Sequence, residues 1–311
     1  MATSGSVDFG HTRTQAIEAA LRKCGVLREG VSASSNQLST GSIALNGLLK
    51  ELMVDGMPLW AIKEIAIFPI HDISYVDLGP SGGHAATTWV HTQTSAAAAA
   101  AATTITVDSI TGISASDNIG VELDSGNIFW TTVSGAPSGS TITLATGLTT
   151  AAAVDSHVYT YTNKTVRPLK IIQAARFDYT NSDQQPLNIV SRDEFQRLSA
   201  TTTEGEPNQI YYDPQLTNGR VRFYPRFSNG NSIIKVWGQR PFEDMDEATN
   251  TFDFPQEWEL AIVFGLAAIL APEMGVPDRK MITLTQLAAS YRMKAGEFGQ
   301  EEGSVYFTAG R

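Results

Sequence analysis

The sequence predicts an α+β protein in which a helical bundle, built from both chain ends, carries inserted all-β material of the barrel or sandwich type. Apolar residues recur at helical spacing near both ends, and short strand-like runs separated by turn residues fill the middle. Residues 85–163 contain five acidic residues and no Lys or Arg, which is typical of a separate module. The expected parts are a helical hairpin (1–58), a β-rich segment in two pieces (59–95 and 164–241), an inserted small β module (96–163), the C-terminal helical half of the bundle (242–298) and a docking tail (299–311).

Two amphipathic helices are expected at the N-terminal end. In residues 12–24, Thr12 is a suitable N-cap, and Gly25 stands where a glycine commonly ends a helix. Cys24 is expected to pack there as a small apolar residue rather than to react as a thiol. The second helix covers residues 35–55. The two helices form a hairpin whose apolar stripe must be buried on another part of the chain.

Short strands are expected from residue 59 onward. Residues 60–68 have a strand-like pattern, and the seven alanines at 96–102 are expected to be a linker that leads into the module. The turn Thr217-Asn218-Gly219 predicts a hairpin. Further strands are expected at 119–123, 128–133, 141–144 and 158–161 in the module, and at 169–174, 209–212, 221–224 and 233–238 after it.

Two more long helices are expected near the C-terminal end. Residues 256–270 follow Pro255, a residue type favoured at helix starts, and are expected to end or kink at Pro272. Residues 278–298 show a second helical pattern. A short helix is expected at 191–198.

The charge balance limits the possible functions. The chain of 311 residues has 22 basic and 32 acidic side chains, which gives a net charge of −10. This balance repels phosphate and disfavours a generally basic nucleic-acid binder. The single cysteine excludes an intrachain disulfide scaffold.

Neither a secretory signal nor a membrane span is expected. The first ten residues lack the apolar region of a signal peptide. The longest apolar run, residues 260–271, is shorter than the roughly 20 residues that a span needs. Folding in a cytoplasm is therefore expected.

Three patterns resemble catalytic or metal sites, but loop and turn roles explain them better. Residues 79–83 match the nucleophile elbow G-x-S-x-G, yet no helix pattern follows. His84 and His91 could form a two-histidine metal site, but they lack the usual helical spacing. Three aspartates considered as calcium ligands lack the register of a calcium loop: Asp117, Asp124 and Asp155. No catalytic residue, metal or cofactor is therefore predicted.

Basic and aromatic residues are interleaved in the later strands. Such a pattern marks either a nucleic-acid surface or the polar face of a sheet that packs on an acidic neighbouring subunit. The acidic net charge favours the second interpretation. The residues are Arg220, Arg222, Phe223, Tyr224, Arg226, Phe227, Lys235 and Trp237.

Both helical ends resemble parts of a known family. The segments AALRKCGV (19–26) and LNGLLKELMVDG (45–56) are similar to the N-terminal hairpin of head-to-tail adaptor proteins of short-tailed phages, also called packaged-DNA stabilisation or head-completion proteins. The segment EWELAIVFGLAAILAPEMGV (257–276), followed by YRMK (291–294), resembles their second helical half. Within the module, DNIGVELD (117–124) and WTTV (130–133) look like an insertion found in larger phage connector proteins.

The resemblance implies a structural protein rather than an enzyme. Adaptors of this type form a twelve-fold ring under the portal protein, extend the DNA channel and present a platform for the tail nozzle. The implied location is the portal–tail junction of a virion that assembles in the bacterial cytoplasm. The implied partners are the portal protein, the nozzle or tubular tail protein, a tail fibre or tailspike, other copies of this chain, and double-stranded DNA that passes through without sequence-specific binding. No membrane is among them.

Two sets of residues are predicted to serve this role. By analogy of position, Val305, Tyr306 and Phe307 are expected to dock on the portal. Acidic side chains are expected to face the channel, because they repel phosphate and let the duplex slide. The candidates are Asp253, Glu257, Glu259 and Glu273.

Two other functions remain open at this point. A tail-associated protein whose β module binds or cleaves glycans would have aromatic side chains along a β groove, with carboxylates in a deep pocket nearby. A minor capsid or decoration protein would not bind the portal.

Overall fold

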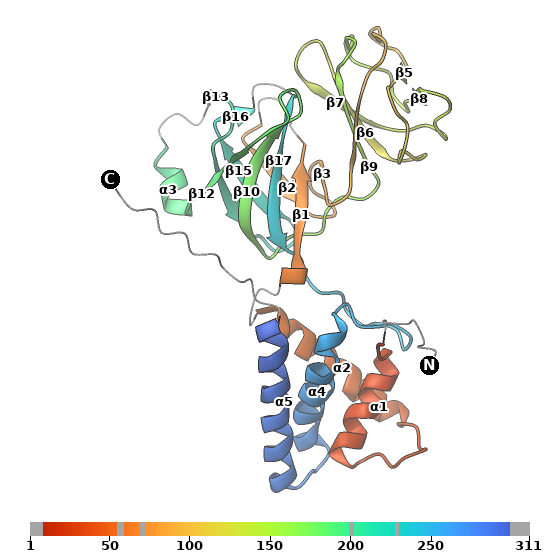
Figure 1. Cartoon of the computed structure of the whole chain (residues 1–311), viewed down its shortest axis with the longest axis vertical. Coiled ribbons are helices and arrows are strands. Elements are labelled where there is room, and N and C mark those ends of the chain that lie inside the picture. Colours follow the sequence, from red (N-terminus) through yellow and green to blue (C-terminus); the bar gives the residue numbers. More distant parts are fainter. Residues whose placement is uncertain (1–8, 55–58, 69–72, 199–201, 228–229, 299–311) are drawn as a thin grey trace, which may run out of the picture. The chain divides into compact units, whose positions relative to one another are not determined.

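A computed structural model of the chain describes residues 9–54, 59–68, 73–198, 202–227 and 230–298 (Figure 1). The chain divides into two compact units. The helical unit combines Met1–Ala61 with Phe242–Arg311, and the sheet unit is Ile62–Pro241. Each unit has a hydrophobic core of its own.

The predicted fold class is wrong. The described part of the chain is mostly β-sheet, with five sheets and few helices (28% helical, 30% strand), and is not a helical bundle built from both chain ends. The physical reason is that the middle segments pair with one another over long sequence distances and close a large core themselves. Local periodicity does not reveal such pairing.

The described residues of the helical unit form four long helices. These are α1 (Arg13–Cys24), α2 (Ser35–Val54), α4 (Glu259–Glu273) and α5 (Asp278–Phe298), with 3₁₀ turns at η1 (Leu59–Ala61) and η2 (Gln256–Trp258). The predicted caps of α1 are confirmed. The Thr12 side chain accepts a hydrogen bond from the Gln15 N–H, the Gln15 side chain accepts one from the Thr12 N–H, and Gly25 ends the helix at φ 75°.

Helix α4 is the central element of the helical unit, because it is apolar on nearly all sides. Helices α1, α2 and α5 all pack against it. Ile262, Leu266 and Leu270 are fully buried, and burial of each stabilises the fold by roughly 1.5–3 kcal/mol. The helix continues through Pro272, beyond its predicted end, since a proline in the last turn forfeits only one helical hydrogen bond. Neither α4 nor any other helix in the described part of the chain is long and apolar enough to cross a membrane.

Two sheets of the sheet unit share one core. The five-stranded sheet has the order β11-β10-β17-β1-β3, and the four-stranded sheet has the order β12-β14-β15-β2. Ile67 and Val236 of the first sheet pack with Val76 and Phe223 of the second. The strands are β1 (Ile62–Ile67), β2 (Tyr75–Leu78), β3 (Ala85–Ala86), β10 (Lys170–Asp178), β11 (Asp183–Pro186), β12 (Asn188–Ile189), β14 (Gln209–Asp213), β15 (Gly219–Tyr224) and β17 (Ser232–Gln239).

The strand register brings the two ends of the sheet unit together. Strand β17 pairs antiparallel with β1, from Ile62 opposite Gln239 to Ile67 opposite Ile234, and with β10 on its other side. The predicted hairpin at Thr217-Asn218-Gly219 is confirmed between β14 and β15. The short helix α3 (Arg192–Gln196) lies within its predicted range, and β13 (Glu204–Gly205) pairs with β16 (Arg226–Phe227).

The segment between β3 and β10 forms a small β module with a separate core. Strands β4 (Val90–Gln93), β9 (His157–Tyr161), β6 (Asn118–Glu122) and β7 (Ile128–Thr132) form one sheet, and β5 (Thr104–Thr106) pairs with β8 (Thr141–Thr143). The alanine run is not a linker. Ala98 is buried in the core of the module, and its backbone pairs with Ala152.

The module packs on the outer face of the five-stranded sheet, which is the face opposite the shared core. Tyr159 and Tyr161 of β9 are buried there together with Phe68 and Ile233. The Tyr159 hydroxyl donates a hydrogen bond to the Gly230 carbonyl at 3.0 Å. Aromatic packing therefore attaches the module to the sheet.

Two glycines of α2 give a matched prediction about helix packing. A Cβ on Gly41 would lie 2.5 Å from Cγ2 of the buried Ile17, whereas one on Gly47 would meet nothing within 4 Å. We expect Gly41→Ala to lower the free energy of unfolding by about 1–3 kcal/mol through overpacking. Gly47→Ala should raise it by about 0.5–1 kcal/mol through helix propensity. Urea denaturation measures both, and a change of the same sign and size in the two variants would contradict this packing.

Candidate assembly surface

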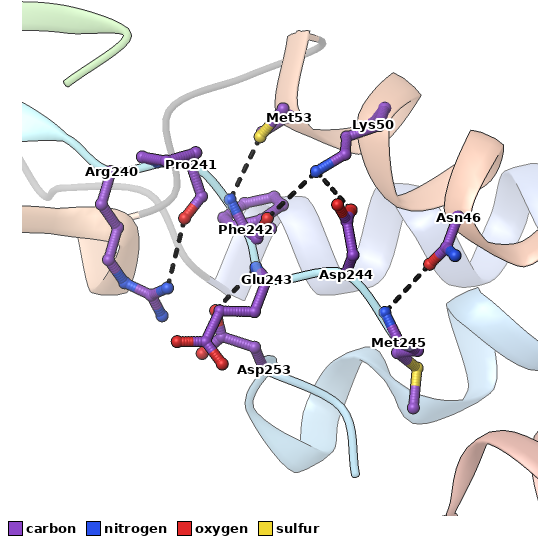
Figure 2. A network of polar contacts seen from close by, with 10 residues as sticks. All are labelled: Asn46, Lys50, Met53, Arg240, Pro241, Phe242, Glu243, Asp244, Met245 and Asp253. Carbon is purple, nitrogen blue, oxygen red and sulfur yellow. Dashed lines mark hydrogen bonds and ion pairs between the residues drawn. The ribbon is translucent and has the colours of Figure 1, made fainter. Parts of the chain in front are cut away.

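The acidic segment that follows the sheet unit is held along α2 (Figure 2). Phe242 and Met245 are buried, and the Met245 N–H donates to Oδ1 of Asn46 at 3.0 Å. Lys50 Nζ donates to the Phe242 carbonyl at 3.2 Å and forms an ion pair with Asp244 at 2.5 Å. The segment is thus anchored by two buried side chains three positions apart. Its exposed carboxylates include Glu243, Asp246 and Glu247.

The first turn of α1 fixes the next residues of this segment. Arg13 Nη1 donates to the Met245 carbonyl at 3.1 Å and also to the Asp246 carbonyl. The Arg13 N–H donates to the Asn250 carbonyl at 2.8 Å. Residues of α1 and α2 therefore hold the acidic segment at a defined place on the helical unit.

The four carboxylates predicted to face a channel lie in different environments. Glu257 and Glu273 are exposed. Asp253 is half-buried, and its Oδ2 accepts a hydrogen bond from the Glu243 N–H at 3.3 Å. Glu259 is only 6% exposed. The structure therefore places Asp253 beside the acidic segment and buries Glu259.

Glu259 holds the residues that precede α1. Its Oε1 accepts a hydrogen bond from the His11 N–H at 2.7 Å, and its Oε2 lies 2.6 Å from His11 Nδ1. The carboxylate also stands in the first turn of α4, where the helix dipole favours a negative charge. Glu259 therefore connects the two chain ends within the helical unit rather than presenting a charge to solvent.

Helix α5 carries large apolar side chains on the side opposite its buried face. Ile282 is 60% exposed and Met293 is 61% exposed. Their spacing of eleven residues is about three helical turns, so the two side chains lie in one stripe. Leu284 and Ala295 of the same helix are buried in the core.

Helix α2 repeats this arrangement. Ile43 is 75% exposed and Val54 is 86% exposed, again eleven residues apart. Contiguous exposed apolar patches commonly mark protein contact sites, and the two side chains of each stripe lie about 16 Å apart along their helix. We call the two stripes, Ile43 with Val54 and Ile282 with Met293, the assembly surface. The equal spacing of these residues is visible in the sequence, but periodicity alone does not show which apolar side chains stay exposed.

The predicted portal-docking residues Val305, Tyr306 and Phe307 lie outside the described residues. Their role stays a prediction. The last described residue, Phe298, is 77% exposed at the end of α5.

Two of the basic residues in the later strands have partners within the sheet unit. Arg220 donates from Nε and Nη2 to the two carboxylate oxygens of Asp77 at 2.7 and 3.1 Å, and these bonds raise the pKa of Arg220. Its guanidinium also lies 4.1 Å from the ring centroid of Tyr75. Lys235 Nζ pairs with Glu64 at 3.2 Å. Much of the positive charge here is therefore already balanced inside the unit.

Three histidines lie where the module meets the five-stranded sheet. His91 Nε2 is 2.9 Å from His157 Nδ1, whereas His84 Nδ1 is 2.7 Å from the Tyr161 hydroxyl. His84 also stacks on Trp130 with 3.8 Å between ring centroids. His84 and His91 therefore have separate partners. Within the described ranges, no group of three or more His, Cys, Asp or Glu side chains is placed to hold a metal ion.

The surroundings of these histidines favour the neutral ring. Burial, together with the positive charge of Lys164, lowers the pKa of His84 to about 4. Burial likewise lowers the pKa of His91 to about 4, with a contribution from His157. The pKa of His157 is lowered by burial, against the opposing charges of Glu122 and Asp178.

The remaining sequence patterns have structural explanations. Residues 79–83 form a loop as predicted, and Asn218 Nδ2 donates to Ser81 Oγ at 2.9 Å. An amide cannot act as the general base that a serine nucleophile needs. Asp117 is buried and accepts a hydrogen bond from the Ser114 N–H at 2.7 Å, whereas Asp124 and Asp155 line one open pocket.

Compared with known proteins, the chain matches no protein-family model and no curated protein.

The two neighbouring glutamates at the start of α4 give a stability prediction. We expect Glu259→Gln to lower the free energy of unfolding by about 1.5–3 kcal/mol, because the charge-assisted bonds to His11 are lost from a buried site. Glu257→Gln serves as the control and should change it by less than about 0.5 kcal/mol, because Glu257 is exposed. Chemical denaturation compares the two, and equal effects would show that the Glu259 pair contributes little.

The neutral histidines predict acid sensitivity of the sheet unit. The folded pKa of His84 is about 4 and its ordinary value is 6.5, so the unfolded chain binds the proton more readily. Stability is then fully present above pH 6.5 and is lost as the pH falls toward 4. From pH 7 to pH 5 this loss is about 2 kcal/mol for His84.

Thermal unfolding at pH 7, 6 and 5 measures this loss. The variant His84→Phe keeps a ring against Trp130 but removes the titrating group, so its melting temperature should fall less between pH 7 and pH 5 than that of the unmodified chain. An identical fall in both proteins would contradict the role assigned to His84.

Proposed function

We propose that this chain is a structural head-to-tail adaptor of a phage virion. Copies of the chain assemble as a ring beneath the portal protein, extend the DNA channel and present a platform for the tail nozzle. The observation that carries the proposal is the assembly surface, where Ile43, Val54, Ile282 and Met293 stand largely exposed on two helices. Covering exposed apolar side chains of this size with another protein surface removes them from water and therefore stabilises the assembly.

The arrangement of the assembly surface suits a ring. A ring is closed by heterologous contacts, in which one patch of a copy meets a different patch of the next copy. The stripes on α2 and α5 are two chemically distinct patches of one unit, since Lys50 lies between Ile43 and Val54, whereas Gln286 and Ala289 lie between Ile282 and Met293. We assign the contact between neighbouring copies to these two stripes. A ring of twelve follows from the resemblance alone.

The acidic surface of the helical unit suits a channel for DNA. Glu243, Asp246, Glu247, Glu257 and Glu273 are exposed, and the segment that carries the first three is anchored along α2. Carboxylates that line a channel repel phosphate, so the duplex passes without being retained. The proposed partners are the portal protein, the nozzle protein, a tail fibre or tailspike, and double-stranded DNA that passes through the channel without sequence-specific binding.

The proposal assigns no chemical reaction to this chain. Its mechanism is association, in which buried apolar area supplies the free energy and shape complementarity supplies the specificity. Its place is then the portal–tail junction of the virion. The tail residues Val305, Tyr306 and Phe307 are proposed as portal contacts, because a short apolar segment that follows α5 in the sequence is suited to insertion between portal subunits.

Electron microscopy of the purified chain mixed with portal rings of the same virus tests the proposal. We expect a collar of twelve copies on the portal. The double variant Ile282→Glu with Met293→Glu should remove the collar, because each substitution places a charge in an apolar contact at a cost of several kcal/mol. Thr283→Glu is the matched control, because Thr283 is exposed on α5 about 100° around the helix from Ile282, and this variant should still form the collar.

Two outcomes would overturn this proposal. The unmodified chain would ignore the portal rings, or the double variant would form the collar as well as the control does. Circular dichroism of each variant establishes that a lost collar does not come from unfolding.

A further inference from the structure

A pocket in the sheet unit is independent of the assembly surface. It is a groove beside Trp237 with a volume of ≈ 570 Å³, which lies within the range of small-molecule sites. The groove is lined by residues of β10, β11, β12 and β17. None of its lining side chains is charged.

Strand register places the main side chains of this groove on one face. Gln173 lies opposite Trp237, Ala175 lies opposite Pro186, and Phe177 lies opposite Gln184. Directly paired residues share a face of a sheet, and so do residues two apart on one strand. These side chains therefore point to the same side of the sheet: Trp237, Gln173, Ala175, Pro186 and Gln184. Ala175 is buried and is the smallest of them.

Trp237 differs from the other tryptophans of the chain. Trp60 stacks on Phe242, Trp89 donates to the Tyr179 hydroxyl, Trp130 stacks on His84, and Trp258 lies 5.9 Å from Phe254. Among the described residues, the Trp237 ring has no aromatic or cationic partner, and its indole N–H has no acceptor. The groove thus offers a rigid aromatic surface and a hydrogen-bond donor that the fold itself does not use.

The amide side chains around Trp237 are also unused. In the described part of the chain, the side chains of Gln173, Gln184 and Asn188 make no hydrogen bond, although all three line the groove. Gln185, which points to the other face of β11, accepts a hydrogen bond from Arg176 at 3.0 Å. Each amide offers both donors and an acceptor, which is the combination that matches a hydroxyl group.

We propose that this groove binds an uncharged oligosaccharide. The C–H face of a pyranose ring packs on the negative face of the Trp237 ring. Its hydroxyl groups exchange hydrogen bonds with the amides of Gln173, Gln184 and Asn188, and Ala175 leaves room for the ring to approach the sheet. No lining side chain of this groove is charged, and Lys235, which lies opposite Ala175 on the same face, is already paired with Glu64. The groove therefore selects against anionic ligands, because no free cation is available to balance them.

Saturation-transfer NMR and calorimetry on the full chain test this inference with three probes, maltohexaose, cellohexaose and chitohexaose. We expect at least one of them to bind. Trp237→Ala should weaken that binding at least about tenfold, whereas Trp237→Phe, which keeps an aromatic face, should weaken it less. Gln184→Ala should also weaken it, and Gln185→Ala is the matched control that should leave it unchanged.

Three results would overturn the inference: no binding of any probe, equal effects of Gln184→Ala and Gln185→Ala, or a change in oligomeric mass on Trp237→Ala without saccharide binding. The last result would mean that a second copy of the chain covers the groove. Because these measurements need no portal, a failure of the adaptor proposal and a failure of this inference are observed separately.

Discussion

The helical unit depends on one constraint, which is that α4 has no polar side along most of its length. A helix of this kind must be covered on several sides, and α1, α2 and α5 provide the cover. Two of these three helices come from the first 54 residues and the third follows α4 directly. The core of the unit therefore forms only when the two ends of the chain meet, and the buried contact between Glu259 and His11 adds a polar connection between the same two ends.

The distribution of ion pairs explains why an acidic surface remains. Arg220, Lys235 and Lys50 are paired with Asp77, Glu64 and Asp244. Acidic residues outnumber basic ones by ten, so pairing inside the units leaves carboxylates in excess at the surface. The anchoring of residues 242–245 on α2 concentrates part of this excess at one place on the helical unit.

Local sequence signals identified the elements well and their assembly poorly. Caps and periodicity located α1, α2 and α5, because these signals act within a few residues. The predicted fold class is wrong, because a short strand such as β2 has little periodicity and pairs with β15, which lies far along the chain. The sequence predicts a linker at the alanine run because alanine carries no strand signal, yet the core of the module contains the small side chain of Ala98.

The candidate sites likewise show that local sequence signals are reliable for exposed residues and miss contacts between distant parts of the chain. Glu257 and Glu273 are exposed, as their hydrophilic character predicts, whereas Glu259 is buried against His11, a histidine 248 positions away. No local rule connects those two residues. Trp237 was noted only as one aromatic residue among several, and its isolation became evident from the register of β10 and β17.

The pairing of β1 with β17 has a mechanical consequence. Ile62 and Gln239 lie opposite each other, so the chain enters and leaves the sheet unit at neighbouring points of adjacent strands. A force that pulls the sheet unit away from these points acts on both strands in the same direction and does not peel one from the other. Since β17 has a strand on each side, the tension spreads across the sheet through rows of hydrogen bonds that share it. Two covalent connections that carry force in parallel resist twisting and stretching better than a single tether.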